Sequence, residues 1–144
     1  MRSTIDEQGE EHATAPSPSH EVIRPDIADQ MNLIMRNVIC AGTASRAKVP
    51  GFTIAGKTGT GYKAQPNGTY FDEDGHKAYY ASFVGFLPAE APRVTILVSI
   101  DEPPASGPRY GGDTAAPVFT KIAEVAINQL DIEPPTVDGG CPET

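Results

Sequence analysis

The 144-residue sequence has no tryptophan, only two cysteines, and few aromatic residues, which make up 7% of the chain. Basic residues are also scarce: 11 lysines and arginines stand against 19 aspartates and glutamates, for a formal charge of −8. A nucleic-acid-binding domain needs clustered basic side chains for the phosphates, so the composition excludes nucleic acid as a partner. No apolar run approaches the ~18 residues of a membrane span, and residues 1–7 contain no apolar signal region. We therefore expect a chain with no signal or anchor of its own.

The cysteines and histidines give no sign of a metal centre. Cys40 and Cys141 lie far apart in the sequence, and no histidine stands at ligand spacing from another histidine or a cysteine. We expect two free thiols, one buried at the end of a helix and one in the tail, with a disulfide between them as the alternative. The acidic run 72–74 lacks the further ligands of a calcium loop, so we expect a solvated turn there. We predict neither a metal nor a cofactor.

The first helix is expected over about 27–40. Asp26 can cap its first turn, and Gly42 is a natural stop. Apolar residues recur at helical spacing and should pack into the core along one face: Ile27, Met31, Ile34, Met35 and Val38.

The last helix is expected over about 115–130, with Pro117 tolerated in its first turn. Val118, Ile122 and Val125 should face the core.

Three strands are expected between these helices. One runs from Phe52 toward Thr60, and a polar loop over 61–78 follows it. The stretches 79–87 and 93–100 are separated by a five-residue turn and should form an antiparallel hairpin. Alternating apolar residues line one face of the last strand, and Leu97 on the other face suggests burial on both sides.

The order of these elements indicates an α+β fold, an antiparallel sheet with packed helices. Residues 1–25 are polar and broken by prolines, so we expect an arm that enters the domain. Residues 26–133 form the domain itself. Residues 134–144 are rich in proline and glycine and are expected to be a disordered tail.

The stretch Lys57-Thr58-Gly59-Thr60, at the end of the first predicted strand, offers an ammonium, two hydroxyls and a glycine. Because side chains alternate along a strand, Lys57 and Gly59 should share one face, and Thr58 and Thr60 the other. Such a strand edge suits a carboxylate-bearing peptide that adds as an extra strand. The alternative is an ordinary strand end with a solvated lysine.

The flanks of this stretch make it specific. Short blocks occur in a fixed order: Gly42-Thr43-Ala44, Val49-Pro50-Gly51-Phe52, Ala55-Gly56-Lys57-Thr58-Gly59-Thr60, 80–86 and 110–119. On these residues, from about 3 to 133, the chain resembles the C-terminal part of the transpeptidase domain of class B penicillin-binding proteins, the cell-division type most of all. The resemblance implies part of a penicillin-binding/β-lactamase-like fold. It also implies an enzyme family that cross-links peptidoglycan stem peptides by serine acyl transfer and binds β-lactams.

The resemblance assigns roles to the central motif. Lys57 would polarise the serine of a Ser-x-Asn motif and keep the site electropositive. Thr58, Gly59 and Thr60 would bind the substrate, with the two hydroxyls on the carboxylate of a D-Ala-D-Ala stem peptide or a β-lactam. The backbone N–H of Thr60 would be one oxyanion donor. The resemblance also implies cell-division proteins as partners.

The other two motifs of the family are not convincing here. No Ser-x-Asn occurs, and the one Ser-x-x-Lys, Ser45-Arg46-Ala47-Lys48, follows the helix-ending Gly42 and runs into the turn at 49–51. A nucleophile of this kind must begin a helix, so we reject Ser45. We expect the nucleophile in an N-terminal half of the domain that this chain lacks, and we expect the chain alone to be inactive. The parent protein would act at the extracytoplasmic face of the plasma membrane.

Two alternatives remain open. The chain could be a non-catalytic module that binds peptides or partners in cell-wall synthesis, or a half that complements a separately made serine-bearing half. For Tyr110-Gly111-Gly112 we favour a helix-entry turn over a loop that shapes the groove. We expect Tyr79 and Tyr80 to pack beside the strand bearing Lys57 rather than to touch substrate.

Overall fold

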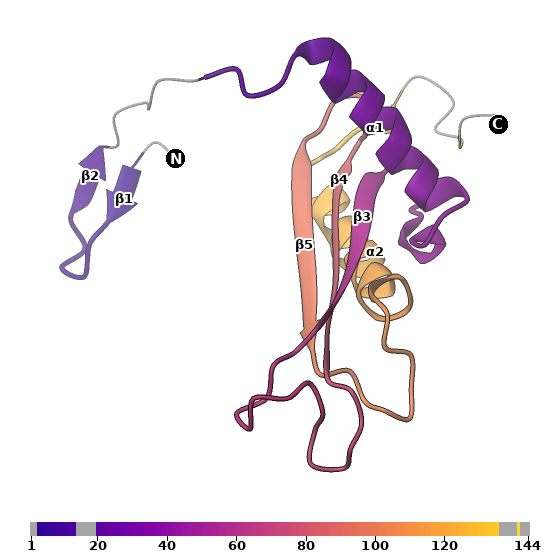
Figure 1. The fold of residues 1–144 in the computed structure, drawn as a ribbon. Helices are drawn as coiled ribbons and strands as arrows, with labels where there is room; N and C mark the ends of the chain where they lie inside the picture. Colours follow the sequence, from indigo (N-terminus) through magenta and orange to yellow (C-terminus); the bar gives the residue numbers. More distant parts are fainter. Residues whose placement is uncertain (1–2, 14–19, 136–140, 142–144) are drawn as a thin grey trace.

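The computed structural model describes residues 3–13, 20–135 and 141 (Figure 1). It confirms the α+β class. The elements, in chain order, are β1 (Ser3–Ile5), β2 (Glu11–Ala13), α1 (Pro25–Cys40), a 3₁₀ turn η1 (Ser45–Ala47), β3 (Ala55–Tyr62), β4 (Tyr79–Leu87), β5 (Val94–Asp101) and α2 (Gly111–Gln129). Within the described residues, neither helix is long and apolar enough to cross a membrane.

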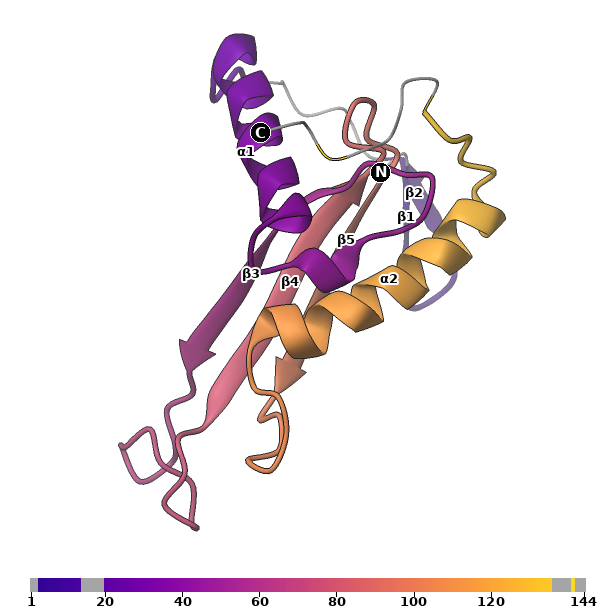
Figure 2. The same cartoon turned by 90° about the vertical axis from the view of Figure 1, so that its right-hand side faces the viewer.

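The main sheet is antiparallel, with strands in the order β3-β4-β5. The short connection over 88–93 joins β4 to β5 as the expected hairpin. Figures 1 and 2 place α2 on one face of the sheet and α1 on the other, beside β3. In the part of the chain that the structure describes, no strand pairs with the outer edge of β3. That edge is therefore available to an added strand.

The core lies between the sheet and α2. Phe83 of β4 and Phe119 of α2 are both fully buried, and their rings meet edge to face with centroids 4.8 Å apart. Gly85 makes room for this contact, because a Cβ atom there would lie 3.0 Å from the Phe119 ring. Small side chains at Ala115 and Ala123 let α2 approach the sheet closely.

The predicted core face of α2 was wrong. The helix begins at Gly111, one turn earlier than expected, so Pro117 lies in its second turn. Val118, Ile122 and Val125 are exposed, because the sheet accepts the Phe119 ring and the small alanines on a different face of the helix.

The start and the packing of α1 also differ from expectation. Its N-cap is Arg24, and Pro25 occupies the first turn, where its fixed φ suits a helix start. Asp26 caps nothing; it accepts a hydrogen bond from Arg24 at 2.9 Å. Only Ile39 of the helix is buried, and the stripe that includes Met31 and Ile34 is largely exposed.

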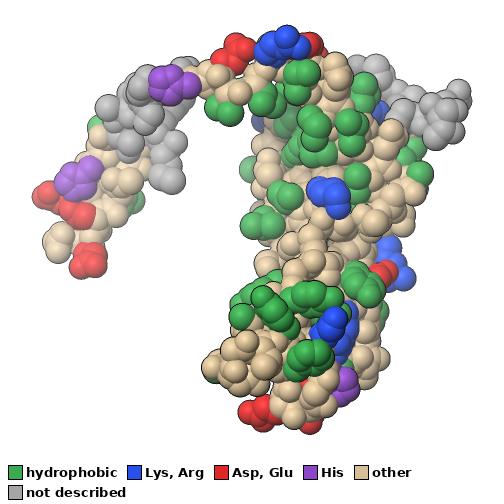
Figure 3. Space-filling model, viewed as in Figure 1, with side chains coloured by type: hydrophobic (Ala, Val, Ile, Leu, Met, Phe, Trp, Pro, Cys, Tyr) green, Lys and Arg blue, Asp and Glu red, His purple; other side chains and the backbone are tan. Residues whose placement is uncertain are grey.

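The expectation that β5 is buried on both sides was also wrong. Leu97 is 67% exposed, and its cross-strand neighbour Val84 is exposed as well. Figure 3 shows hydrophobic side chains on this outer face, which α1 covers only in part. The part of this face around Val84 and Leu97 thus has no cover among the described residues.

The expected arm contains a hairpin that the sequence did not predict. Strands β1 and β2 pair in antiparallel register, with Ser3 opposite Ala13, around a turn in which Gly9 has a φ of 83°. Three-residue strands are too short to show a period in the sequence. The hairpin stands apart from the main sheet in Figure 1 and packs on no other described element.

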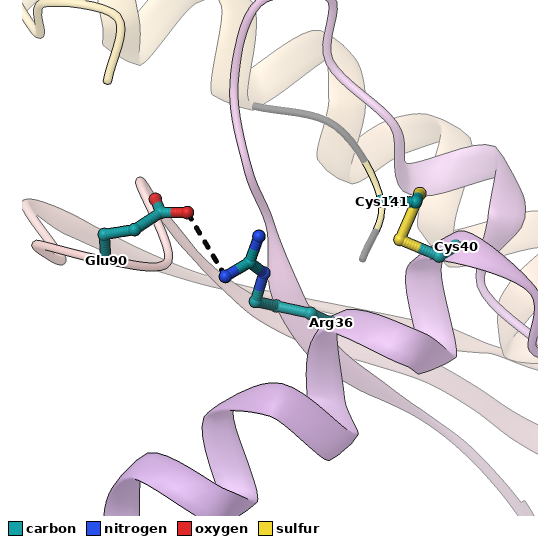
Figure 4. The surroundings of a disulfide bond; sticks show 4 residues. All are labelled: Arg36, Cys40, Glu90 and Cys141. Carbon is teal, nitrogen blue, oxygen red and sulfur yellow. Dashed lines mark ion pairs between the residues drawn. A yellow bond between two sulfur atoms is a disulfide. The ribbon is translucent and has the colours of Figure 1, made fainter. Parts of the chain in front are cut away.

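The two cysteines form a disulfide, which corrects the expectation of two free thiols. Cys40, the last residue of α1, is bonded to Cys141, with Cα atoms 5.3 Å apart (Figure 4). The two cysteines are 101 residues apart in the sequence, and this spacing does not indicate that they lie close together in the fold. One helical turn before Cys40, Arg36 forms an ion pair with Glu90 at 3.3 Å. Most of the predicted tail, 136–140 and 142–144, lies outside the described residues.

Candidate functional site

Strand β3 carries the predicted site residues at the edge of the sheet. Thr58 stands opposite Phe83, so Thr58 and Thr60 project from the face that α2 covers. Lys57 and Gly59 project from the other face, as alternation required. The side chain of Lys57 is exposed and curls over the strand, where its Nζ donates hydrogen bonds to the Thr58 carbonyl oxygen at 3.0 Å and to the Thr58 Oγ1 at 3.2 Å.

The hydroxyl of Thr58 has a second partner. Its Oγ1 lies 2.8 Å from the Oγ1 of Thr43, in the turn that follows α1. This residue was not among the predicted site residues. The only signal was its place in the block Gly42-Thr43-Ala44, which does not reveal that the turn folds back onto β3.

The N-terminus of α2 meets Thr60. The backbone N–H of Gly111 donates a hydrogen bond to the Thr60 Oγ1 at 3.3 Å. Glycine is required at both helical positions: a Cβ on Gly111 would overlap the Ser82 carbonyl oxygen, and a Cβ on Gly112 would overlap the Thr43 carbonyl oxygen. The two glycines therefore allow the first turn of α2 to lie directly against the backbone of β3, β4 and the turn at 43.

Tyr110 fits both of the functions considered for it. It is the N-cap of α2, as a helix-entry turn requires, and it also borders the hollow beside β3. Tyr79 packs between the rings of Tyr62 and Tyr110, beside β3. Tyr80 projects from the opposite face of the sheet, where Lys63 lies 5.4 Å from its ring centroid.

A hollow of about 320 Å³ unites these groups. It is lined by Thr43, Thr58, Thr60, Tyr110, Gly111, Gly112 and Asp113. The N-terminus of a helix carries a partial positive charge and unpaired N–H groups, which favour an anion. Asp113 opposes that field, although Arg46 lies 3.7 Å from its carboxylate. Two hydroxyls, a helix N-terminus and a nearby ammonium suit the carboxylate of a ligand.

The rejected Ser45 lies outside this arrangement. Residues 45–47 form a three-residue 3₁₀ turn rather than the start of an α-helix, in keeping with the turn signals that follow. Lys48 borders a different hollow, of about 400 Å³, next to the disulfide. That hollow has mostly apolar walls, among them Ile39, Phe52 and Ile54, and contains none of the predicted site residues.

Two exposed clusters bring metal-ligand atoms together, within 4.8 Å of one another in each case. They are Asp6, Glu10 and His12 in the β1–β2 hairpin, and Asp72, Asp74 and His76 in the loop after β3. The sequence pattern did not predict that a histidine would join either acidic group. Within these clusters Asp6 accepts a hydrogen bond from His12, and Asp72 accepts one from the backbone N–H of His76. Exposed carboxylates are satisfied by such bonds and by water, so we assign neither cluster a metal.

Known proteins align with this chain over most of its length. It is 39% identical to a probable peptidoglycan D,D-transpeptidase PenA of Neisseria flavescens, over 87% of this chain and 30% of that protein. It is 34% identical to the peptidoglycan D,D-transpeptidase FtsI of Escherichia coli K12, over 87% of this chain and 20% of that protein. The chain thus spans between a fifth and a third of the length of these relatives.

Solved structures share the fold. Penicillin-binding protein 3 of Mycobacterium tuberculosis, in complex with ampicillin, matches with a TM-score of 0.72 and 26% identity over 100% of this chain and 33% of that chain. The apo transpeptidase domain of Burkholderia pseudomallei penicillin-binding protein 3 matches with a TM-score of 0.66 and 33% identity, over 91% of this chain and 36% of that chain. Residues 1–124 match the family described as the penicillin binding protein transpeptidase domain. The chain therefore belongs to the penicillin-binding protein transpeptidase family.

Proposed function

We propose that this chain supplies the Lys-Thr-Gly half of a D,D-transpeptidase active site that cross-links peptidoglycan stem peptides and is acylated by β-lactams. The observation that carries the proposal is the hollow beside β3. There the hydroxyls of Thr58 and Thr60 stand next to the N-terminus of α2, while Lys57 lies against Thr58. The names of the two relatives, a probable peptidoglycan D,D-transpeptidase and a peptidoglycan D,D-transpeptidase, point to the same reaction.

Each residue of the motif has a defined task in this proposal. Thr58 and Thr60 donate hydrogen bonds to the terminal carboxylate of a D-Ala-D-Ala peptide or to the carboxylate of a β-lactam. Gly59 has no side chain, so the substrate can approach the backbone closely between Thr58 and Thr60. Lys57 holds the site electropositive and polarises the serine of a Ser-x-Asn motif. The backbone N–H of Thr60 is one of two donors to the oxyanion of the tetrahedral intermediate.

The nucleophile comes from a segment outside this sequence. In the complete site the serine hydroxyl attacks the carbonyl of the penultimate D-Ala. The bond to the terminal D-Ala breaks and releases that residue with the transferred proton, and the amine of a second stem peptide then attacks the resulting ester. No Ser-x-Asn and no helix-starting Ser-x-x-Lys occur here, so we expect the chain alone to be inert.

The exposed apolar face of the sheet supports a second half as partner. The side chains of Val84 and Leu97 are exposed on the outer face of the sheet. The apolar stripe of α1, which includes the exposed Met31, lies beside them. An uncovered face of this kind indicates a contact surface. We infer that the N-terminal half of the transpeptidase domain covers it, either on the same polypeptide or as a separate chain.

The disulfide supports an extracytoplasmic location. Bonds such as Cys40–Cys141 persist in oxidising compartments and are rare in the cytosol. We therefore place the protein at the outer face of the plasma membrane, where cell-division proteins are the partners to test.

A second function rests on the outer edge of β3, which pairs with no strand among the described residues. An exposed strand edge can accept a peptide as an added strand without any covalent chemistry. In this alternative the chain is a non-catalytic binding module of the cell-wall synthesis machinery.

The test is a chimera in which this chain replaces the corresponding segment of Neisseria flavescens PenA, here called the PenA chimera. We expect a fluorescent penicillin to acylate the chimera and not the isolated chain. Lys57→Ala should slow acylation by about 10² or more, the size of effect seen when a preorganised charge or donor is removed. Lys121→Ala is the matched control, because Lys121 is an exposed lysine of α2 remote from the motif.

A cooperative thermal transition must first show that the chimera is folded. A folded chimera that stays unlabelled would contradict the enzyme proposal and favour the binding module. Labelling of the isolated chain would overturn the claim that the nucleophile lies elsewhere.

A further inference from the structure

Four tyrosines form a continuous row at the end of the sheet next to the candidate site. Tyr70 lies 5.8 Å from Tyr62 between ring centroids, Tyr62 lies 5.3 Å from Tyr79, and Tyr79 lies 6.3 Å from Tyr110. Tyr62 and Tyr79 are opposite each other in the register of β3 and β4. We call these four residues the tyrosine row.

The row continues from the hollow that holds Thr58 and Thr60. Tyr62 projects from the same face of β3 as Thr60, two residues further on, which corresponds to about 7 Å along a strand. At one end of the row, Tyr110 lines the hollow itself. A ligand whose carboxylate occupies the hollow therefore has the tyrosine row directly beside it.

Three rings of the row are exposed to solvent, and Tyr79 is half-buried among them. Tyr62 is 53% exposed, Tyr70 is 52% exposed and Tyr110 is 60% exposed. Contiguous exposed aromatic surface marks a binding surface.

Two cations accompany the row without a carboxylate partner among the described residues. Lys77 Nζ lies 4.6 Å from the Tyr62 ring centroid, and the Arg109 guanidinium lies 5.6 Å from that of Tyr79. Arg109 donates a hydrogen bond to the Lys77 carbonyl oxygen at 2.9 Å, so the two charges are held together. The hydrogen bond from the Lys77 ammonium to the Tyr62 hydroxyl raises the pKa of Lys77, which keeps the side chain charged.

The nearby carboxylates are engaged elsewhere. Asp72 lies in the same loop as Lys77, but its carboxylate accepts hydrogen bonds from backbone N–H groups of its own turn. Its Oδ1 also lies 3.7 Å from Nδ1 of His76. Glu102 pairs with Lys63 at 3.2 Å. In a chain of net charge −8, this end of the molecule thus presents exposed aromatic rings beside two positive charges that have no carboxylate partner among the described residues. Figure 3 shows hydrophobic and basic side chains at this end of the molecule, with acidic side chains at its tip.

We infer that the tyrosine row, with Lys77 and Arg109, binds a peptidoglycan strand beyond the reacting peptide: sugar rings lie against the tyrosine faces, and free carboxylates of a stem peptide pair with the two cations. Tyrosine faces carry partial negative charge, and the ring C–H groups of a pyranose carry partial positive charge. The combination of stacking faces and fixed cations matches a polymer of linked sugars from which carboxylate-bearing peptides branch. This inference rests on the proposed function, because the polymer is the one that function requires.

The test is a titration of the full chain with a disaccharide-tetrapeptide from muramidase-digested peptidoglycan, followed by NMR amide shifts. We expect shifts at the tyrosine row as well as at Thr58 and Thr60. Tyr70→Ala and Lys77→Gln should each weaken binding roughly three- to tenfold, the usual range for one aromatic or charged contact. Tyr80→Ala is the matched control, since Tyr80 is a similarly exposed tyrosine on the opposite face of the sheet.

Each outcome decides the inference. Binding that the row variants leave unchanged, while Thr60→Val weakens it, would overturn the inference and leave the proposed function intact. Binding of the chain to phosphatidylglycerol vesicles through Tyr70, without binding of the muropeptide, would overturn it in favour of a membrane contact. Absence of any muropeptide binding at millimolar concentration would also overturn it, and acylation of the PenA chimera would show separately whether the proposed function survives. Unchanged thermal transitions must show that the variants are folded.

Discussion

The hydroxyl of Thr43 lies 2.8 Å from the hydroxyl of Thr58 and joins the turn after α1 to the strand that carries the Lys-Thr-Gly motif. Thr58 also accepts a hydrogen bond from Lys57. The Thr58 hydroxyl thus makes two hydrogen bonds, one with the Lys57 ammonium and one with the Thr43 hydroxyl. Together they restrict its orientation. Thr43 is therefore a positioning residue for the carboxylate-binding group proposed at Thr58.

We predict that Thr43→Val in the PenA chimera slows acylation by penicillin about three- to tenfold, the kinetic equivalent of one lost hydrogen bond of about 0.5–1.5 kcal/mol. Valine preserves the shape and removes the hydroxyl. The measurement is the second-order rate of labelling with a fluorescent penicillin.

Thr43→Ser is the matched control, because serine restores the hydroxyl and should restore most of the rate. A Thr43→Val chimera that acylates as fast as the parent would show that Thr58 is positioned without Thr43.

The Cys40–Cys141 bond should make the stability of the chain depend on redox conditions. It closes a loop of 101 residues, for which the chain-entropy account gives a contribution of about 4–5 kcal/mol. We predict that dithiothreitol lowers the free energy of unfolding by an amount approaching that value, and the measurement is urea unfolding with and without the reductant.

The variant Cys40→Ala should unfold like the reduced chain, and its stability should not respond to dithiothreitol. Counting thiols by alkylation and mass spectrometry provides an independent check. Two free thiols in the purified, unreduced chain would contradict the disulfide.

The core contact between Phe83 and Phe119 should dominate the packing of α2. We predict that Phe119→Ala costs about 3–5 kcal/mol of stability, because the ring is fully buried and its neighbours cannot fill the space. The adjacent Val118, 39% exposed, is the matched control, and Val118→Ala should cost no more than about 1 kcal/mol. Equal losses in urea unfolding would show that the helix packs on the other face.

These residues also show what the sequence could and could not reveal. The faces of Lys57 and Thr58 followed from strand alternation alone, because the period of two is imposed by the backbone. The orientation of α2 did not follow, because both Val118 and Phe119 belong to plausible apolar stripes. The choice depends on the space that Gly85 leaves in a strand 34 residues earlier.

Contacts between distant segments were equally hidden. Thr43 reaches Thr58 only because the turn after α1 folds back onto β3, and Cys141 reaches Cys40 only because the chain end returns to α1. Local patterns carry information on periods and turns, whereas such approaches are decided by packing. The family motif filled part of this gap for the hollow at β3, since its residue order implies a known arrangement, but it said nothing of the disulfide.

The β1–β2 hairpin should loosen in acid. Asp6 accepts a hydrogen bond from His12 at 2.7 Å and further bonds from the backbone N–H groups of Glu10 and Gln8, and these bonds hold the pKa of Asp6 below its usual range. Because the folded pKa is the lower one, the stabilisation is complete above the ordinary pKa of about 3.9 and disappears as the pH falls through the folded value. We predict that NMR amide shifts of Gln8 and Glu10 titrate with a midpoint below about 3.9 and that Asp6→Asn abolishes this titration. Glu7→Gln is the control, since Glu7 makes no such bond among the described residues, and a midpoint at or above the ordinary value would contradict the hydrogen-bonded turn.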